Sequence, residues 1–242
     1  MPISFAGKIL TVFDVTAEQA SSTQSPRVPL RYAIEFMLDG ETPGRVLNDE
    51  CMRIMLPCLR GPETIVELGG SGDYYKNFVP GQKFEVTNYE APCDRIVDMT
   101  KMPFESGSIA AFVSMFALEH VYDFHAVIRE CLRCLKPGGR LLLAVPFLYY
   151  YHGAPDDYFR FTDSALDRML SGFTVLKKVS LGNRGLLLCQ LFHEKRILGS
   201  THGWLLRFMF RAFCLIPLLT GLLGNQRDRR YAITHLYLVQ KP

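Results

Sequence analysis

The feature of this sequence that most limits its fold is the block Thr64–Phe147, in which short apolar runs alternate with amphipathic stretches. This order is typical of βαβ units and a parallel sheet. The runs are largely continuous rather than alternating, which suits strands covered by helices on both faces. We therefore predict a doubly wound α/β fold. The expected strands are Thr64–Leu68, Phe84–Thr87, Arg95–Asp98, Ala110–Phe116 and Arg140–Val145, with later strands at Phe173–Ser180 and Tyr231–Val239.

Helical spacing of apolar residues predicts helices at Leu30–Leu38, Val46–Leu59 and Tyr122–Leu135. The segment Lys136–Gly139 (KPGG) should end the third helix, because proline cannot continue a helix and glycine permits the turn back into the sheet. Thr162 is a suitable N-cap for a further helix.

We expect one domain by default, since 242 residues of which 48% are apolar can bury a sizeable core. Within it, residues 1–60 would form an N-terminal helical cap and 61–182 the core. Residues 183–230 would form an apolar helical insert or lid, and 231–242 a closing strand of the core sheet.

Charge and cysteine usage exclude several classes of protein. The net charge of +3 gives no strong field for capturing nucleic acid, so no nucleic-acid partner is expected. Seven scattered cysteines are unlike a disulfide framework and favour a reducing compartment. Cys131 and Cys134 have metal-site spacing without a second pair nearby, so we expect no metal.

The sequence favours a cytoplasmic protein. The apolar run at residues 9–13 is followed by Asp14 without a small-residue cleavage site, so a secretory signal is not expected. The longest uncharged apolar stretch, Ala212–Gly224, is shorter than a bilayer requires and contains Pro217, so a membrane-spanning helix is not expected either.

An acidic residue, Glu67, lies at the carboxyl end of the first expected strand, and a glycine-rich turn with Gly69, Gly70 and Gly72 follows it. In open α/β sheets ligands bind outside the carboxyl ends of strands, and glycine lets the backbone approach them closely. The third glycine of the dinucleotide pattern G-x-G-x-x-G is absent, which favours a nucleoside cofactor without phosphates. A plain tight turn would explain these glycines equally well.

Three further motifs make a resemblance specific. They are Asp98–Phe104 (DMTKMPF), Leu118–Val121 (LEHV) and Leu135–Gly139 (LKPGG). With the glycine turn, they resemble the class I methyltransferases that use S-adenosylmethionine, including the branch with ubiquinone, menaquinone and glycan methyltransferases. The resemblance covers about Thr64–Leu170 and implies a seven-stranded, mostly parallel, Rossmann-like sheet.

The resemblance implies a set of cofactor-binding residues. Glu67 and the glycines of the turn would hold the methionine part of the cofactor, Asp98 would accept a hydrogen bond from the adenine amine, and Met99 would pack on the ring. Phe116, at the end of the fourth expected strand, is a further candidate. Asp98 and Met99 could instead be a helix cap and a core residue.

This chain departs from the family at the second strand. The family usually has an acid there for the ribose hydroxyls, whereas this chain has Thr87 and Asn88. The amide of Asn88 could still hydrogen-bond a hydroxyl.

Two segments supply catalytic candidates. His120 follows the fourth expected strand, where an imidazole could act as a base or be purely structural. Residues 152–162 resemble the H-x-x-P-x-D-Y-x-R-[FY]-T segment of glycan-cluster methyltransferases. His152, Asp156, Asp157 and Arg160 could bind a hydroxylated acceptor and remove its proton, or Asp157 and Arg160 could pair only to fix the loop.

The leading functional hypothesis is methyl transfer from S-adenosylmethionine to a hydroxyl of a sugar-containing or other small hydroxylated acceptor. The alternatives are C-methylation of a quinone-like or lipid-linked acceptor, and a non-catalytic cofactor-binding module. The apolar stretch Trp204–Leu223 could be a lid, a core helix, a dimer contact or an interfacial segment that gives residues 203–224 a peripheral membrane contact.

Overall fold

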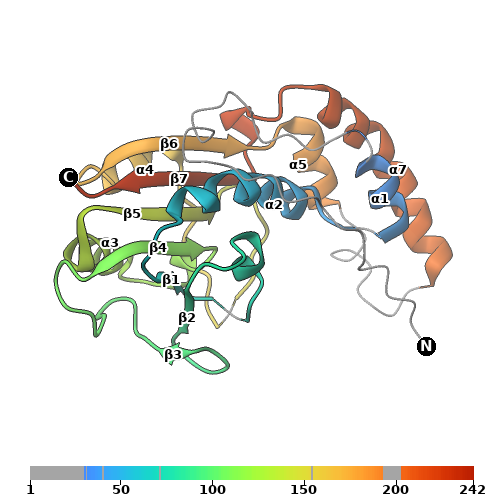
Figure 1. The fold of residues 1–242 in the computed structure, drawn as a ribbon. Coiled ribbons are helices and arrows are strands. Elements are labelled where there is room, and N and C mark those ends of the chain that lie inside the picture. The colour runs from blue at the N-terminus through green and yellow to red at the C-terminus, as the bar shows by residue number, and fades with distance from the viewer. Residues whose placement is uncertain (1–29, 31, 40, 71, 154, 193–202) are drawn as a thin grey trace.

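The computed structural model describes residues 30, 32–39, 41–70, 72–153, 155–192 and 203–242, and within them it contains one seven-stranded sheet (Figure 1). The strand order is β3-β2-β1-β4-β5-β7-β6. All neighbours among the first five strands pair in parallel, and β7 runs antiparallel to both β5 and β6. The prediction of a mostly parallel, Rossmann-like sheet is confirmed. The strands are β1 Ile65–Leu68, β2 Phe84–Asn88, β3 Arg95–Ile96, β4 Ile109–Met115, β5 Leu135–Pro146, β6 Thr174–Leu181 and β7 Thr234–Gln240.

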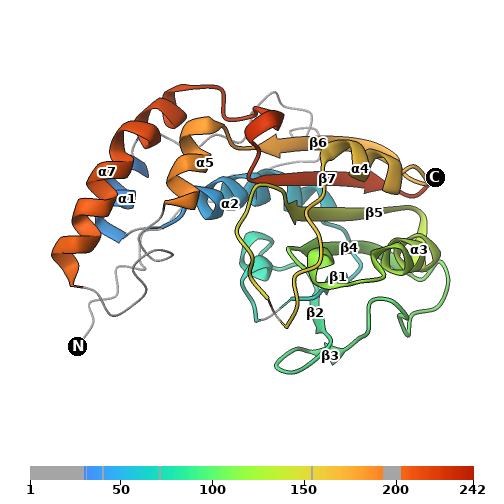
Figure 2. The same cartoon turned by 180° about the vertical axis from the view of Figure 1, so that it is seen from behind.

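Helices cover both faces of the sheet, and each face has its own apolar core. Successive strand residues alternate between the two cores, so that Ile65 packs on one face and Val66 on the other. Figure 1 shows α2 in front of the sheet, and Figure 2 shows α3 and α4 on the opposite side. The helices are α1 Tyr32–Asp39, α2 Pro43–Met55, α3 Phe124–Cys134, α4 Asp163–Met169, α5 Arg184–Leu191 and α7 Trp204–Leu223.

Side-chain caps fix the starts of several helices. Thr162 Oγ1 accepts a hydrogen bond from the Ala165 amide at 3.2 Å, which confirms it as the N-cap of α4. Asp123 caps α3 in the same way, at 2.9 Å from the Ala126 amide. Thr42 caps α2 and Pro43 occupies its first turn, so this helix begins before the predicted Val46.

Three strands differ from their predicted bounds by two residues or more. Strand β7 begins at Thr234, because Tyr231 ends the short 3₁₀ helix Arg229–Tyr231. Strand β3 contains only Arg95 and Ile96, both exposed at the sheet edge, so Asp98 lies beyond its end. Strand β5 begins at Leu135, which already pairs with Ile109, and the register shifts before Arg140 pairs with Ala111. The KPGG segment is therefore an irregularity within a long strand, not a separate connection between helix and strand.

Helix α1 and the late apolar helices α5 and α7 pack together beyond one end of the sheet (Figure 1). Figure 1 shows α1 beside α7, and Arg211 Nη1 of α7 donates to the Met37 carbonyl of α1 at 2.8 Å. Helices α5 and α7 cross at Gly185, where a Cβ would lie 2.3 Å from the Pro217 carbonyl oxygen. The two segments predicted as a cap and an insert thus share one helical group, and the division of the chain into four parts stays a prediction.

Helix α7 coincides with the apolar stretch Trp204–Leu223 singled out in the sequence. It runs for 20 residues, continues through Pro217 and includes Arg207 and Arg211, so it is longer than the uncharged stretch Ala212–Gly224. By length and composition α7 could cross a bilayer, a test that core helices of soluble proteins also pass. The N-terminal apolar run at residues 9–13 lies outside the described residues.

All seven cysteines lie in the described part of the chain and are free thiols. Burial raises the pKa of Cys131 and Cys134, both of which face the core on α3.

Candidate functional site

The glycine turn after β1 is held between the segments that follow β3 and β4. Gly69 has φ +75°, a conformation that glycine adopts without strain. A Cβ at this position would lie 2.4 Å from Ala117 Cβ and 3.1 Å from Met99 Cε. The turn and the Asp98–Met99 segment, which the resemblance assigns to one cofactor, therefore lie at the same edge of the sheet.

Glu67 lies buried beneath this turn. Its side chain is 2% exposed, and its Oε2 has no hydrogen-bond partner among the described residues. Burial raises the pKa of Glu67 to about 7. A Cβ on Gly70 would lie 2.4 Å from Glu67 Cδ, so the position of this carboxyl group requires glycine there. By contrast, a Cβ on Gly72, which also has positive φ, would meet no atom within 4 Å.

Asn88 and Asp98 both make contacts with the backbone. Asn88 Nδ2 donates to the Gly70 carbonyl at 3.0 Å and its Oδ1 accepts from the Tyr89 amide at 2.7 Å. Asn88 thus ties β2 to the glycine turn. Asp98 Oδ1 accepts from the amide of Thr100 at 2.8 Å and from its hydroxyl at 2.7 Å. The Asp98 side chain is otherwise exposed at the end of the sheet.

A cavity of about 750 Å³ adjoins the turn. Phe116, with φ 54°, lines it and directly precedes Ala117, the residue that contacts Gly69. Of the predicted site residues, Phe116 and His152 line the cavity and the others do not. The full lining is Glu41, Thr42, Gly44, Arg45, Val46, Asn48, Asp49, Tyr74, Tyr75, Phe116, Pro146, Tyr149, His152, Ile233 and Thr234.

Sequence reasoning missed the part of this wall that α2 provides. Asn48 is 1% exposed and its Nδ2 donates to the Tyr75 hydroxyl at 3.4 Å, while the Tyr74 hydroxyl donates to Asp49 Oδ2 at 2.5 Å. One signal was available, because Asn48 is a polar residue beside Leu47 and close to Cys51 on an otherwise apolar helix face. Buried polar groups of this kind usually have a partner or a role.

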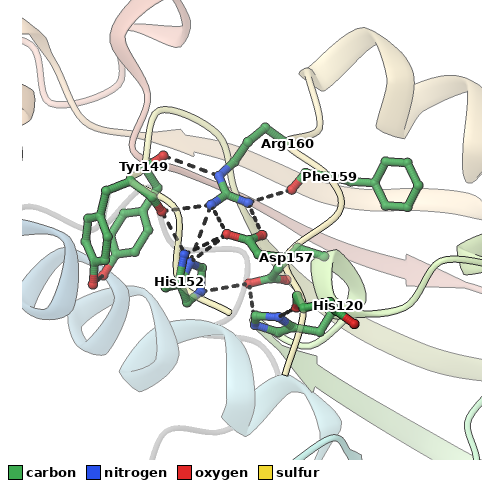
Figure 3. A network of polar contacts seen from close by, with 9 residues as sticks. His120, Tyr149, His152, Asp157, Phe159 and Arg160 are labelled. Carbon is green, nitrogen blue, oxygen red and sulfur yellow. Dashed lines mark hydrogen bonds and ion pairs between the residues drawn. The ribbon is translucent and has the colours of Figure 1, made fainter. Parts of the chain in front are cut away.

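The loop after β5 is fixed by Arg160 and Asp157 (Figure 3). Arg160 hydrogen-bonds both carboxylate oxygens of Asp157, and its Nη2 also donates to the Tyr150 carbonyl at 2.8 Å. The Asp157 side chain is 1% exposed, and its hydrogen bonds with Arg160 lower its pKa to about 2. Such a carboxylate is a poor proton acceptor, which favours the loop-fixing interpretation of this pair.

His120 and His152 meet beside Glu119, a residue of the short 3₁₀ helix Leu118–His120. Their ring centroids are 5.0 Å apart, and the Nε2 atoms lie 3.8 Å and 3.7 Å from Glu119 Oε1. Asp156 contributes its backbone carbonyl to His120, while its carboxylate accepts a hydrogen bond from the Tyr158 hydroxyl at 2.9 Å. The loop thereby brings His152 to the segment after β4.

Comparisons with known proteins support the fold and a methyltransferase domain. Residues 75–143 match a family model described as a methyltransferase domain. The chain is 44% identical over 46 residues to a demethylmenaquinone methyltransferase of Mycolicibacterium gilvum, covering 19% of this chain and 20% of that protein. It is 52% identical over 40 residues to a ubiquinone biosynthesis O-methyltransferase of Xanthomonas oryzae, covering 16% and 17%. The matches thus span about a fifth of these relatives' length.

The whole fold also has solved counterparts. A geranyl diphosphate C-methyltransferase from Streptomyces coelicolor superposes with a TM-score of 0.54 over 93% of this chain and 88% of its own, at 15% identity. The strand order is that of the methyltransferase fold, and residues 75–143 carry the match to the methyltransferase domain. These sequence matches are to a demethylmenaquinone methyltransferase and a ubiquinone biosynthesis O-methyltransferase, and they are confined to short segments.

Proposed function

We propose that this protein transfers a methyl group from S-adenosylmethionine to a hydroxyl of a small acceptor bound in the cavity. The observation that carries the proposal is the meeting of the glycine turn with the Asp98–Met99 segment beside that cavity. In the reaction an oxygen–methyl bond forms while the sulfonium–methyl bond breaks. The hydroxyl loses its proton, and S-adenosylhomocysteine is the second product.

On the cofactor side, the chemistry of the residues suits a cationic nucleoside. The buried carboxyl of Glu67, which lacks a hydrogen-bond partner at Oε2, is complementary to the ammonium of the methionine part. Gly69 and Gly70 have no side chain, so a ligand can approach the backbone closely at these positions. Asp98 would accept a hydrogen bond from the adenine amine, and Met99 would pack against the ring.

On the acceptor side, the cavity combines aromatic rings with hydrogen-bonding groups. Tyr74, Tyr75 and Tyr149 provide rings and hydroxyls, and His152 provides a titratable group. This mixture suits a sugar-containing or other hydroxylated acceptor. We assign the acceptor hydroxyl to the side of the cavity formed by His152.

Isothermal titration with S-adenosylmethionine tests the cofactor half of the proposal. We expect 1:1 binding by the full chain. Asp98→Asn keeps an oxygen for the Thr100 contacts but removes the charge, so its affinity should fall by about tenfold or more. Asp228→Asn is a matched control, because Asp228 also accepts from the amide two residues on and lies outside the proposed cofactor site. No binding by the folded wild-type chain would refute the proposal.

A second candidate function is C-methylation of a quinone-like or lipid-linked acceptor. The names of the short-matching relatives favour it, and so does an apolar stripe on α7, formed by Leu205, Met209, Phe213 and Ile216, which are 58–75% exposed. These residues recur at helical spacing and suit a peripheral contact of residues 203–224 with a membrane.

Mass spectrometry with a labelled methyl donor distinguishes the two candidate functions by identifying the atom that is methylated. Cofactor binding without S-adenosylhomocysteine release over broad acceptor panels would favour a non-catalytic module.

A further inference from the structure

Polar atoms of three side chains lie close together between the segment after β4 and the loop after β5. Glu119 is fully buried, and neither of its carboxylate oxygens has a hydrogen-bond partner among the described residues. One donor atom from each of Glu119, His120 and His152 lies within 4.8 Å of the other two. Figure 3 shows His120 and His152 turned toward each other.

The other nitrogen of each ring faces oxygen atoms. His120 Nδ1 lies 2.6 Å from the Asp156 carbonyl. His152 Nδ1 lies 3.2 Å from Asp157 Oδ2 and 3.3 Å from the Tyr150 carbonyl. The nearby Arg160 Nη2 is more distant, at 3.4 Å, and already donates to Asp157 and Tyr150. Because an ionised carboxylate and a carbonyl can only accept, each Nδ1 carries a ring proton, which leaves Nε2 as the atom that can bind a metal when the ring carries no second proton.

With both rings neutral, two Nε2 atoms and a buried carboxylate oxygen converge without a hydrogen-bond donor among the described residues. A cation between the three atoms makes this arrangement favourable. Hydrogen bonds from Nδ1 to a carboxylate or a carbonyl are also the outer contacts that orient metal-binding histidines. Two histidines and one glutamate form a common catalytic zinc site, in which three protein ligands leave a fourth position open.

We propose that Glu119, His120 and His152 bind one divalent transition-metal ion of the zinc type. This differs from the sequence analysis, which expected no metal because it considered only Cys131 and Cys134. His152 also lines the cavity, so the open position faces the space assigned to the acceptor. That position takes an oxygen ligand, which is the acceptor hydroxyl if the proposed function holds and water otherwise. A metal in this place makes a bound hydroxyl a better nucleophile by favouring loss of its proton.

Metal binding is tested without cofactor or acceptor. The full chain is stripped with a chelator, titrated with Zn²⁺ by calorimetry, and titrated separately with Co²⁺ to follow its visible absorption. We expect one ion per chain, with micromolar or tighter affinity and cobalt bands of low coordination number. No stoichiometric binding by the folded chain would overturn the proposal.

Substitutions of single histidines test which residues bind the ion. His152→Ala removes a half-buried ligand and should weaken Zn²⁺ binding by at least a hundredfold, with circular dichroism confirming the fold. The matched control is His125→Ala, an exposed histidine of α3 outside the cluster, which should bind as the wild type does. Unchanged binding by His152→Ala would assign the ion to other donors, such as the free thiols, and would overturn the site.

The proposed metal site and the proposed function can be refuted independently of each other. S-adenosylmethionine binding is measured on the metal-free chain, where it does not depend on the three ligands. Zinc binding without cofactor binding would refute the proposed function and leave the metal site intact. Cofactor binding without zinc binding would do the reverse.

Discussion

The charge of Glu67 couples cofactor binding to pH. Its carboxyl is kept from water and lacks a hydrogen bond at Oε2, so the neutral form is favoured in the folded chain. A ligand ammonium would favour the ionised form. Binding of S-adenosylmethionine should therefore release a proton near neutral pH, and affinity should rise as the pH passes through about 7.

Glu67→Gln should remove a pH dependence of stability. The pKa of Glu67 is raised from an ordinary value of 4.5 to about 7, so between these values the folded state binds more protons than the unfolded state. The free energy of unfolding then falls as the pH rises across this window, by up to about 3 kcal/mol. Urea titrations of wild type and variant from pH 4 to 8 measure the difference. Parallel curves for the two proteins would contradict the assigned environment.

The two turn glycines with positive φ should respond differently to alanine. Gly69→Ala places a methyl group 2.4 Å from Ala117 Cβ, so the turn must shift and cofactor affinity should fall by more than tenfold. Gly72→Ala meets no atom within 4 Å and carries only backbone strain of about 1 kcal/mol. Calorimetry and thermal melts compare the two variants. Equal losses would mean that backbone strain alone decides the effect.

At the scale of elements, the loop after β5 depends on one buried ion pair. Asp157→Asn should destabilise the fold by roughly 3 kcal/mol, because Arg160 is left without its charged partner. The pKa of Asp157 is lowered, so its stabilising effect is present above the ordinary value of 3.8 and is lost as the pH falls through about 2. Asp156→Asn is the neighbouring control. Its exposed carboxylate accepts a hydrogen bond from Tyr158 as its one side-chain contact among the described residues, so the change should alter stability by about 0.5 kcal/mol or less. Denaturant midpoints near pH 7 test the contrast, and similar values for both variants would contradict it.

The stripe on α7 predicts binding to lipid vesicles. Replacing both Phe213 and Ile216 with serine should lower partitioning onto vesicles of phosphatidylcholine and phosphatidylglycerol by at least tenfold, because two exposed apolar side chains are lost. Ile96→Ser is the control, since this residue is 64% exposed on edge strand β3. Co-sedimentation measures the bound fraction. A wild-type chain that stays in the supernatant would exclude the membrane contact.

The elements that were predicted well are those whose pattern is local. Strand β1 and the following turn could be located because an apolar run meets glycines, and α4 because Thr162 precedes its first turn. Strand β3 was predicted too long because pairing at its exposed edge ends after two residues, which its own sequence does not show. Helix α7 follows the apolar stretch Trp204–Leu223, and its packing against α5 at Gly185 is a long-range contact that the local pattern does not show.

At the scale of the whole molecule, cofactor binding should be visible in thermal stability. A ligand at a hundred times its Kd stabilises the folded state by about 2.7 kcal/mol. For a chain of this size that corresponds to a rise in Tm of roughly 5–10 °C. Differential scanning fluorimetry with S-adenosylmethionine and S-adenosylhomocysteine should show it. A shift with nicotinamide dinucleotide instead would point to a different cofactor.

The cavity could not be predicted from the sequence, because its wall joins segments that are far apart along the chain. Thr42 and Asn48 come from the first fifth of the sequence, Tyr149 and His152 from the middle, and Thr234 from the end. The candidate cofactor residues could be proposed from the sequence, since each lies at or near the carboxyl end of an expected strand. Glu119 is next to His120 in the sequence, but its meeting with His152 depends on the path of the loop after β5.

Because α2 forms part of the cavity, the residues proposed to bind the cofactor and those proposed to bind the acceptor lie in different parts of the sequence. The proposed donor site is formed by residues after β1 and β3, whereas one side of the acceptor space comes from a helix that precedes both. Substitutions at Arg45, Asn48 or Asp49 can therefore retune which molecule is accepted while the residues around Gly69 stay as they are. Natural variation or directed evolution confined to that one helix would be enough to give related chains different acceptors.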